Sequence, residues 1–434
     1  MVSNEMLVTT CGKIQLVYFP FYRIAFEANS KAIDMLKEIV IEKKDKKIIE
    51  ENISALDEIL KQLANKKPYS FPTLSNKSLN FRSLIILPNY KCNFSCSYCY
   101  SSKGRSNKEI SLENLKIGLD HFIKITKQNA LKEIRVSFLG GGEPILSWDA
   151  LVWSYEYLYK SLSENNLKIL FSITTNGSLL NDDYIQWIVQ HNVHINVSFE
   201  ILSDIQNIQR GQFDKVAQNI KKMLKAGVNI SIRSTITENN VLKMVEMVRN
   251  VLMHYPTIKK LHFEPVTQEL DSSIYYSNFI KYFFRARQLA SENGIKLICS
   301  LTKSFSSLRK RFCGGELCLT PDGLYTICHR SSSPMDKNFN SFVYGKIVDN
   351  QVQIDNLKVA SILKKNIFDY SECNQCIAKW HCAGGCLYQR INYDKIQMQN
   401  NCNFFKSTIS LLLLEKINKT EFDKIINSNQ IINL

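Results

Sequence analysis

The grouping of its cysteines constrains this chain more than any other feature of the sequence. Eleven of the thirteen fall in three segments, residues 92–99, 313–328 and 373–402, whereas Cys11 and Cys299 stand apart. The chain starts without a basic stretch followed by an apolar core, so we expect no signal peptide and a cytoplasmic location. In a reducing compartment, clustered thiols favour metal binding over disulfides. We therefore predict that metal organises part of the fold, and that Cys299, in an apolar segment, is a buried small hydrophobe.

The sequence divides into four segments. Residues 1–80 predict a small α+β domain with two short strands around Pro20 and two helices after them. Residues 81–304 alternate six short apolar strands with amphipathic helices, which is typical of a parallel sheet, and we expect an α/β fold curved into a partial (β/α)6 TIM-like barrel. Residues 305–406 are rich in Cys, Gly and short loops, which predicts a domain built around metal. Residues 407–434 predict a C-terminal helical tail.

Charge and hydropathy argue against two classes of partner. The formal net charge of +15, from 55 basic and 40 acidic residues, favours acidic partners. The basic residues are dispersed and not interleaved with aromatic residues in one segment, so we expect no nucleic acid. The longest aliphatic run near the end, Leu411 to Leu414, is far too short to cross a bilayer, so we expect no membrane partner.

The first cysteine group follows the first predicted barrel strand, where barrel enzymes place their chemistry. Cys92, Cys96 and Cys99 form a C-x3-C-x2-C motif, and three thiolates on a short loop can hold three irons of a cubane cluster. The fourth iron is then left for a small molecule. A structural zinc knuckle is the alternative, but neither His nor Cys supplies a fourth ligand nearby.

A second motif, Gly140-Gly141-Gly142-Glu143-Pro144, follows the second predicted strand. Glycines let the backbone approach a ligand closely, and Glu143 offers a carboxylate to an ammonium group. With the cysteine loop beside it, this segment is predicted to be part of a site rather than a plain turn.

The two motifs resemble the radical SAM superfamily, which has an aromatic residue (here Tyr98) before the last cysteine and a GGE segment. The resemblance covers roughly residues 82–300. It implies a 4Fe–4S cluster on the first cysteine group that binds S-adenosyl-L-methionine (SAM), reductive cleavage of SAM to a 5′-deoxyadenosyl radical, and an electron donor such as flavodoxin or ferredoxin. It also implies that SAM is contacted by Tyr98, Gly141, Gly142, Glu143, Thr175, Asn176, Ser198, Arg210, Arg233 and Glu264. One departure is that relatives commonly read S-L-D-G where this chain has Ser198-Phe199-Glu200-Ile201.

Eight cysteines in the C-terminal part of the chain make two sets of four, and two tetrathiolate sites are the simplest solution for them. Zinc ribbons are the alternative, since spacing alone does not exclude zinc. The pattern is similar to the SPASM domain, which carries two auxiliary 4Fe–4S clusters and would bring the total to three. By resemblance, one cluster has the ligands Cys313, Cys318, Cys328 and Cys386, and the other has Cys373, Cys376, Cys382 and Cys402.

The resemblance favours an oxidoreductase that modifies a peptide C–H bond. We expect a maturase that oxidatively modifies, and by preference cross-links, a ribosomally made (RiPP) precursor peptide. Residues 1–80 resemble leader-peptide recognition domains, in which a strand edge takes the leader by β-augmentation. A sulfatase activator that generates formylglycine is the alternative, but that family keeps an Asp where this chain has His329. His329 is a candidate catalytic base. A non-enzymatic zinc-ribbon binding protein is the alternative from another class.

Overall fold

The computed structural model describes residues 5–41, 54–71, 81–162, 167–266 and 272–428. Residues 72–80, the end of the segment predicted as the N-terminal domain, lie outside these ranges. Within these ranges, no helix has the length and apolar character needed to span a bilayer.

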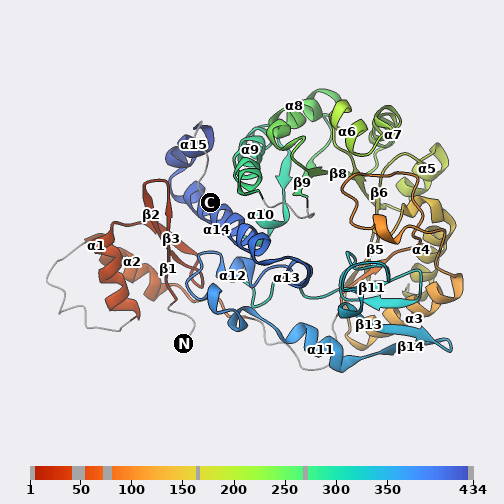
Figure 1. Ribbon diagram of the computed structural model, residues 1–434, viewed down its shortest axis with the longest axis horizontal. Helices are drawn as coiled ribbons and strands as arrows, with labels where there is room; N and C mark the ends of the chain where they lie inside the picture. Colours follow the sequence, from red (N-terminus) through yellow and green to blue (C-terminus); the bar gives the residue numbers. More distant parts are fainter. Residues whose placement is uncertain (1–4, 42–53, 72–80, 163–166, 267–271, 429–434) are drawn as a thin grey trace.

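One large sheet forms the centre of the molecule, and it is curved like part of a barrel (Figure 1). Its strands follow the order β10-β9-β8-β7-β6-β5-β4-β11-β12-β13-β14. The barrel strands β4 to β10 are parallel and are neighbours in chain order, as six β-then-α units require. Their bounds are Ser83–Ile86, Glu133–Phe138, Lys168–Thr175, His194–Ser198, Ile230–Ile236, Lys260–Pro265 and Lys296–Ile298. The predicted α/β partial barrel is confirmed, and β10 extends it by one strand.

The sheet does not close at β4, because a strand from the cysteine-rich segment occupies that edge. Strand β11 (Leu317–Leu319) pairs parallel with β4, with Cys318 opposite Ile85. Antiparallel strands β12 (Leu324–Thr326), β13 (Val343–Val348) and β14 (Gln351–Ile354) then continue the same sheet. The cysteine-rich segment is thus joined to the barrel by backbone hydrogen bonds.

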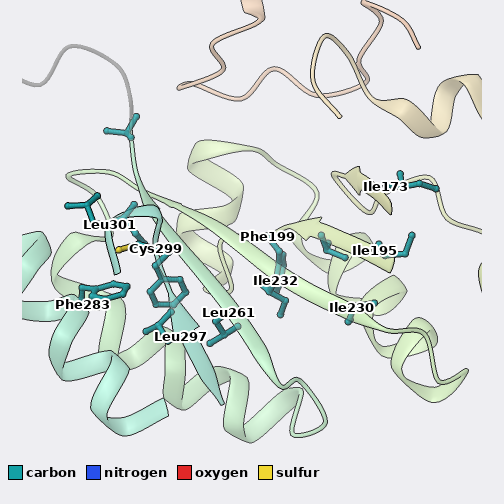
Figure 2. Close-up of a cluster of buried hydrophobic side chains, with 14 of the residues drawn as sticks. Ile173, Ile195, Phe199, Ile230, Ile232, Leu261, Phe283, Leu297, Cys299 and Leu301 are labelled. Carbon is teal, nitrogen blue, oxygen red and sulfur yellow. The ribbon is translucent and has the colours of Figure 1, made fainter. Parts of the chain in front are cut away.

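Amphipathic helices cover the outer side of the barrel strands (Figure 1). Alternate residues of each strand, such as Ile195, Ile232 and Leu261, belong to a cluster of buried hydrophobic side chains, and Cys299 lies in the same cluster (Figure 2). The sequence prediction for Cys299 is therefore confirmed. The helices are α3 (Leu112–Gln128), α4 (Trp148–Leu162), α5 (Asp182–Gln190), α6 (Ser203–Gln209), α7 (Phe213–Lys225), α8 (Met244–His254) and α9 (Ser273–Glu292).

The N-terminal unit is a three-stranded antiparallel sheet with helices beside it. The sequence predicts two strands, and the structure adds β1 (Leu7–Cys11) to β2 (Ile14–Phe19) and β3 (Ile24–Glu27). The helices are α1 (Ser30–Leu36), which continues as a π-helical turn over Lys37–Ile41, and α2 (Ser54–Asn65).

A long C-terminal helix joins the N-terminal unit to the barrel (Figure 1). Helix α14 (Lys395–Ile417) packs Phe404 against Tyr276 of α9 and bonds Ser410 to Thr9 of β1. The predicted boundary at residue 406 falls inside this helix. The other helices of this region are α10 (Ser300–Ser304), α11 (Asn356–Lys364), α12 (Lys379–Cys382), α13 (Leu387–Asn392) and α15 (Lys419–Asn427).

Candidate functional site

The first cysteine group lies on the loop that leaves β4, and two arginines point at its thiols. Arg105 Nη2 donates to Cys99 Sγ at 3.1 Å, and Arg210 Nη1 donates to Cys96 Sγ at 3.7 Å. Burial raises the pKa of the Cys96 thiol above its usual value, and the charge of Arg210 opposes that rise. The two guanidinium groups therefore favour the thiolate form that a metal cluster needs.

The glycines of the second motif let two loops touch through their backbones. Gly142 N donates to Asn89 O at 2.9 Å, and Glu143 N donates to Lys91 O at 2.7 Å. A Cβ atom on Gly142 would lie 1.8 Å from Lys91 O, and Gly141 adopts φ +66°. Only glycine fits at both positions, so this motif fixes the GGE segment against the cysteine loop.

The Glu143 carboxylate is buried and is bound by the chain itself. Its Oε1 accepts hydrogen bonds from Thr175 Oγ1 (2.6 Å) and Ile145 N (3.1 Å), and its Oε2 accepts one from Asn176 N (2.7 Å). The structure thus brings together three predicted SAM contacts from the ends of β5 and β6. Sequence analysis expects Glu143 to accept from an ammonium group, whereas here it ties these two strand ends to each other.

Two polar residues that the sequence analysis missed extend this contact to the cysteine loop. Asn176 Nδ2 donates to Asn93 Oδ1 at 2.9 Å, and Asn93 Nδ2 donates to Ser178 Oγ at 2.8 Å. Asn93 directly follows Cys92, and its position inside the motif is the signal that could have indicated it.

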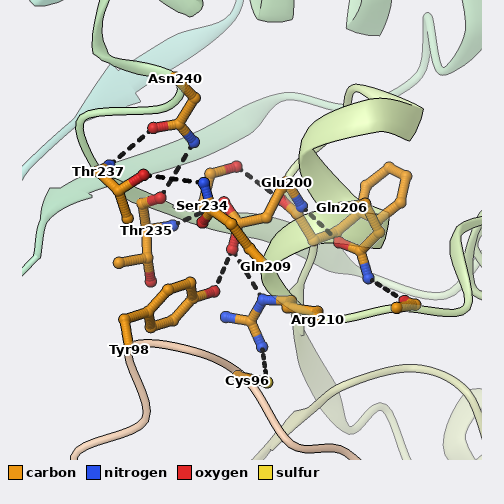
Figure 3. Close-up of polar contacts among 12 residues, drawn as sticks. Cys96, Tyr98, Glu200, Gln206, Gln209, Arg210, Ser234, Thr235, Thr237 and Asn240 are labelled. Atoms are coloured by element: carbon orange, nitrogen blue, oxygen red, sulfur yellow. Dashed lines mark hydrogen bonds and ion pairs between the residues drawn. The ribbon is translucent and has the colours of Figure 1, made fainter.

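A buried carboxylate, Glu200, gathers the residues around Cys96 (Figure 3). It accepts hydrogen bonds from the Tyr98 hydroxyl, from Arg210 Nε at 2.7 Å and from Thr235 N at 3.0 Å. The Arg210 side chain also lies over the Tyr98 ring. The pKa of Arg210 is raised, because the charges of Tyr98 and Glu200 more than offset the effect of its burial.

Glu200 holds the turn after β7 even though the expected glycine is absent. Ile201 takes φ +69°, a left-handed conformation that a β-branched residue rarely adopts. The sequence analysis singled out this departure but did not assign a role to Glu200. The turn keeps its shape because Glu200 is held by its three donors and by a bond from its own N to Gln206.

The remaining predicted SAM contacts lie on strands β7, β8 and β9. Ser198 at the end of β7 is opposite Arg233 of β8, which in turn is opposite His262 of β9, so the three form a row across the sheet. Glu264, two residues further on β9, accepts from both Ser300 N (3.1 Å) and Ser300 Oγ (3.0 Å). The structure therefore places Ser198 and Arg233 together and connects Glu264 to the segment after β10.

Electrostatic effects on the pKa of their thiols connect the other eight cysteines in two sets. Burial raises the pKa of the Cys382 thiol far above its usual value, and the neighbouring Cys402, Cys376 and Cys373 raise it further. In the same way, burial and then Glu316 and Cys386 raise the pKa of Cys328, and Cys328 is among the groups that raise the pKa of Cys318.

The cysteines of each set come from distant parts of the chain. Cys402 is on α14, whereas Cys386 precedes α13 and is near Cys313. Among the described residues, no three His, Cys, Asp or Glu side chains form a group that could hold a single metal ion.

His329 is held by an acidic partner that the sequence did not indicate. Its Nδ1 lies 2.9 Å and 3.0 Å from the two carboxylate oxygens of Glu316, and its backbone N donates to Glu316 at 2.7 Å. Burial alone would raise the pKa of Glu316, but the contacts with His329 hold it below its usual value. The ring of Tyr100, from the cysteine loop, packs edge-on against His329.

Comparisons with known proteins give a family match and several relatives. Residues 86–251 match the radical SAM superfamily. The radical SAM cyclopropyl synthase TigE of Paramaledivibacter caminithermalis is 23% identical over 380 residues, which are 79% of this chain and 76% of that protein. A cysteine-type anaerobic sulfatase-maturating enzyme of Clostridium perfringens strain 13 is 23% identical over 360 residues, which are 75% of this chain and 94% of that protein.

Two solved structures share the fold. Native anSMEcpe with bound AdoMet and Cp18Cys peptide superposes with a TM-score of 0.60 and 20% identity, over 78% of this chain and 99% of that one. Streptococcus suis SuiB bound to precursor peptide SuiA superposes with a TM-score of 0.50 and 14% identity, over 91% of this chain and 98% of that one.

The loop of three cysteines, the glycine-dependent contact beside it and the family match define a radical SAM domain. This class implies SAM and a 4Fe–4S cluster, and the donor set fits that group, because three thiols on one loop are faced by two cations. Over most of its length the chain is similar to a cyclopropyl synthase and to anaerobic sulfatase maturases.

Proposed function

We propose that this protein is a peptide maturase that oxidatively modifies, and by preference cross-links, a ribosomally made precursor peptide. When bound, the reduced cluster and SAM supply a carbon-centred radical that removes hydrogen from an unactivated C–H bond. The described residues hold the reactants in place: Glu143, Asn176 and Asn93 fix the loops around the cluster. Ser198, Arg233 and Glu264 are the proposed further SAM contacts from the sheet.

The cysteines are proposed to hold three clusters. Cys92, Cys96 and Cys99 would hold the one that binds SAM. The mutual effects on thiol pKa support the two four-cysteine sets that the resemblance implies, because Cys386 is near Cys313 and Cys328, and Cys402 is near Cys376 and Cys382. The auxiliary clusters would accept the electron that remains after substrate oxidation.

The observation that carries the peptide assignment is the build of the N-terminal unit. Among the described strands β3 pairs only with β2, so its other edge can accept a peptide strand. A hollow of about 370 Å³ lies beside that strand, between Ile24 and α2. Lys61 and Lys66 outnumber Glu58 among its charged lining residues, which suits an acidic leader.

The N-terminal unit is fixed to the cysteine-rich segment rather than hanging from it. The Tyr18 hydroxyl and His381 Nε2 are 2.9 Å apart and buried, and Lys379 Nζ donates to Glu5 at 2.5 Å. A leader bound at β3 would therefore be held at a constant distance from the cysteine groups. The similarity to TigE, a cyclopropyl synthase, and to SuiB, whose structure contains a bound precursor peptide, is consistent with this role.

Sulfatase maturation is the second candidate, and the similarity to sulfatase-maturating enzymes favours it. Against it stands His329, at the position where that family keeps an Asp. We propose His329 as the base of the reaction, with Glu316 binding Nδ1 and leaving Nε2 to accept a proton.

One experiment separates the two candidates. The holoenzyme is incubated with a candidate precursor peptide, taken from a short reading frame beside the gene, and in parallel with a sulfatase-type peptide that carries the target Cys or Ser. We expect loss of two hydrogens from the precursor only, with no product that reacts with an aldehyde-specific hydrazide. An aldehyde formed on the sulfatase-type peptide would instead establish formylglycine formation.

The N-terminal assignment has its own control. Replacing Lys61 and Lys66 by Glu is expected to weaken precursor binding severalfold at low salt, because each exposed charge pair contributes up to about 1 kcal/mol. The exposed Lys215 and Lys221 on α7, changed in the same way, should leave binding unaltered. If both double variants bind the precursor peptide equally well, the hollow between Ile24 and α2 is excluded as the leader site.

A further inference from the structure

Helices α4 and α5 lie on the outer side of the barrel (Figure 1). A hollow of about 420 Å³ is lined by residues of these two helices. It is separate from the cysteine groups and from the hollow between Ile24 and α2 in the N-terminal unit. Four aromatic residues, one aliphatic residue and three acidic residues line it: Trp148, Trp153, Tyr184, Trp187, Val152, Asp149, Glu156 and Asp183. It therefore combines aromatic faces with negative charge, and no positive side chain is among these lining residues.

Three of the four aromatic side chains contact one another, and all four are partly exposed. Trp148 stacks on Tyr184 with ring centres 4.1 Å apart, and Trp187 stands edge-on to Trp148 at 5.3 Å. Trp153 stacks on Tyr157 and is not among the buried residues of α4. Three of the four tryptophans of the chain thus line one surface hollow, which core packing of α4 and α5 alone does not require.

The three carboxylates make this surface negative, whereas the net charge of the chain is positive. Asp149 and Asp183 lie in the first turns of α4 and α5, where the helix dipole accounts for an acidic residue, but Glu156 lies two turns further along. All three are exposed, and within the described part of the chain none of them forms an ion pair, whereas the neighbouring Asp182 is paired with Lys222 at 2.9 Å. In a chain of net charge +15 this is a local acidic surface.

We infer that this hollow binds an arginine or lysine side chain presented by a partner polypeptide. A cation over a tryptophan face gains from the ring quadrupole, and a carboxylate beside it accepts its N–H groups. An apolar ligand would make no favourable contact with the three carboxylates, and an acidic partner would be repelled by them. The hollow opens to the surface between two helices, which suits a side chain that projects from a folded or extended partner.

The position of the hollow places this partner at the functional end of the barrel. Trp148 follows Glu143 by five residues along the chain, and Tyr184 follows the Asn176–Ser178 turn by six. Both helices begin where the strands that carry the predicted SAM contacts end. The inference does not depend on which peptide the enzyme modifies.

Tryptophan fluorescence of the holoenzyme reports on this hollow directly, because Trp380 is the one tryptophan elsewhere and it is fully buried. The probe is a short peptide, acetyl-Gly-Arg-Gly-Arg-Gly-amide, titrated at low salt beside the matched peptide with Gln in place of Arg. We expect a saturable change in emission with the arginine peptide and none with the glutamine peptide. Isothermal titration calorimetry gives the same dissociation constant.

Two double variants test the location. Asp149→Asn with Asp183→Asn should weaken binding of the arginine peptide at least about threefold, since two charge-assisted contacts are lost. Glu113→Gln with Asp214→Asn removes two charges from the first turns of α3 and α7 instead, and should leave the affinity unchanged. The inference is overturned by equal responses to the two peptides, by no response up to the solubility limit, or by equal weakening in both variants.

Discussion

The contact between Glu200 and Arg210 tests how the cysteine loop after β4 is held in place. The carboxylate is fully buried and the guanidinium is 10% exposed, with Nε and Oε1 2.7 Å apart. Replacing Glu200 by Gln keeps the shape but leaves Arg210 as a buried cation without its counter-charge. Breaking a buried ion pair from one side costs about 3–5 kcal/mol, and the amide recovers part of the hydrogen bonding, so we expect a loss of about 3 kcal/mol.

The assay is thermal unfolding of the anaerobically reconstituted protein, followed by circular dichroism. At about 2–4 °C per kcal/mol for a domain of this size, the Glu200→Gln variant should melt about 6–12 °C lower. Arg210→Met should lose a similar amount, because it leaves the carboxylate buried and unpaired. The exposed pair of Lys222 and Asp182 is the control, and Asp182→Asn should change stability by less than about 0.5 kcal/mol.

The double variant tests whether Glu200 and Arg210 depend on each other. When Glu200→Gln and Arg210→Met are combined, no buried charge is left without its partner, so the loss should be smaller than the sum of the two single losses by about 2 kcal/mol. Losses that add within about 0.5 kcal/mol would refute the reasoning, because they would mean that the two groups act independently.

Three further outcomes are expected. Gly142→Ala should abolish SAM cleavage, since its Cβ would lie 1.8 Å from Lys91 O, whereas Gly314→Ala, with open space around its Cβ, should remain active. Burial and the nearby charge of Arg233 lower the pKa of His262 to about 3. The neutral His262 therefore contributes its full stability above the unfolded pKa of about 6.5, and that contribution is lost as the pH falls. Wild type should lose stability between pH of about 7 and about 4.5 in unfolding experiments, and His262→Gln should remove about 2–3 kcal/mol of that loss. Anaerobic reconstitution should give about twelve irons per chain, falling by about four with no 5′-deoxyadenosine formed when alanine replaces Cys92, Cys96 and Cys99, while zinc in place of iron would contradict the cluster assignment.

Much of the barrel could be predicted because its strands and helices differ in the period of their apolar residues. Strand β5 and helices α5 and α7 fit the predicted alternation of strands and helices, since each is a clear run of one period. Strands β10 and β11 were missed because each has only three residues, and a run so short has no period. Their assignment as strands depends on the neighbours β9 and β4, which the local sequence does not contain.

The site could be predicted where a motif brings its residues together along the chain, and not where the fold does so. The cysteine loop was found from its spacing, and the Gly141-Gly142-Glu143 segment from its place after the second predicted strand, beside that loop. Glu200 was missed because its partners, Tyr98, Arg210 and Thr235, come from three other segments of the chain. Glu316 was missed for the same reason, because it lies thirteen residues from the His329 that it holds.

The pairing of β11 with β4 has a consequence for how the protein is made. Cys318 lies opposite Ile85, about 230 residues earlier in the chain, so the edge of β4 stays open on the ribosome until most of the protein has been synthesised. An unpaired parallel edge invites association between nascent chains. A truncated chain that ends before β11 should therefore aggregate even though it contains every strand of the barrel, and the thiols of the first loop would meet oxygen and stray metal during that interval.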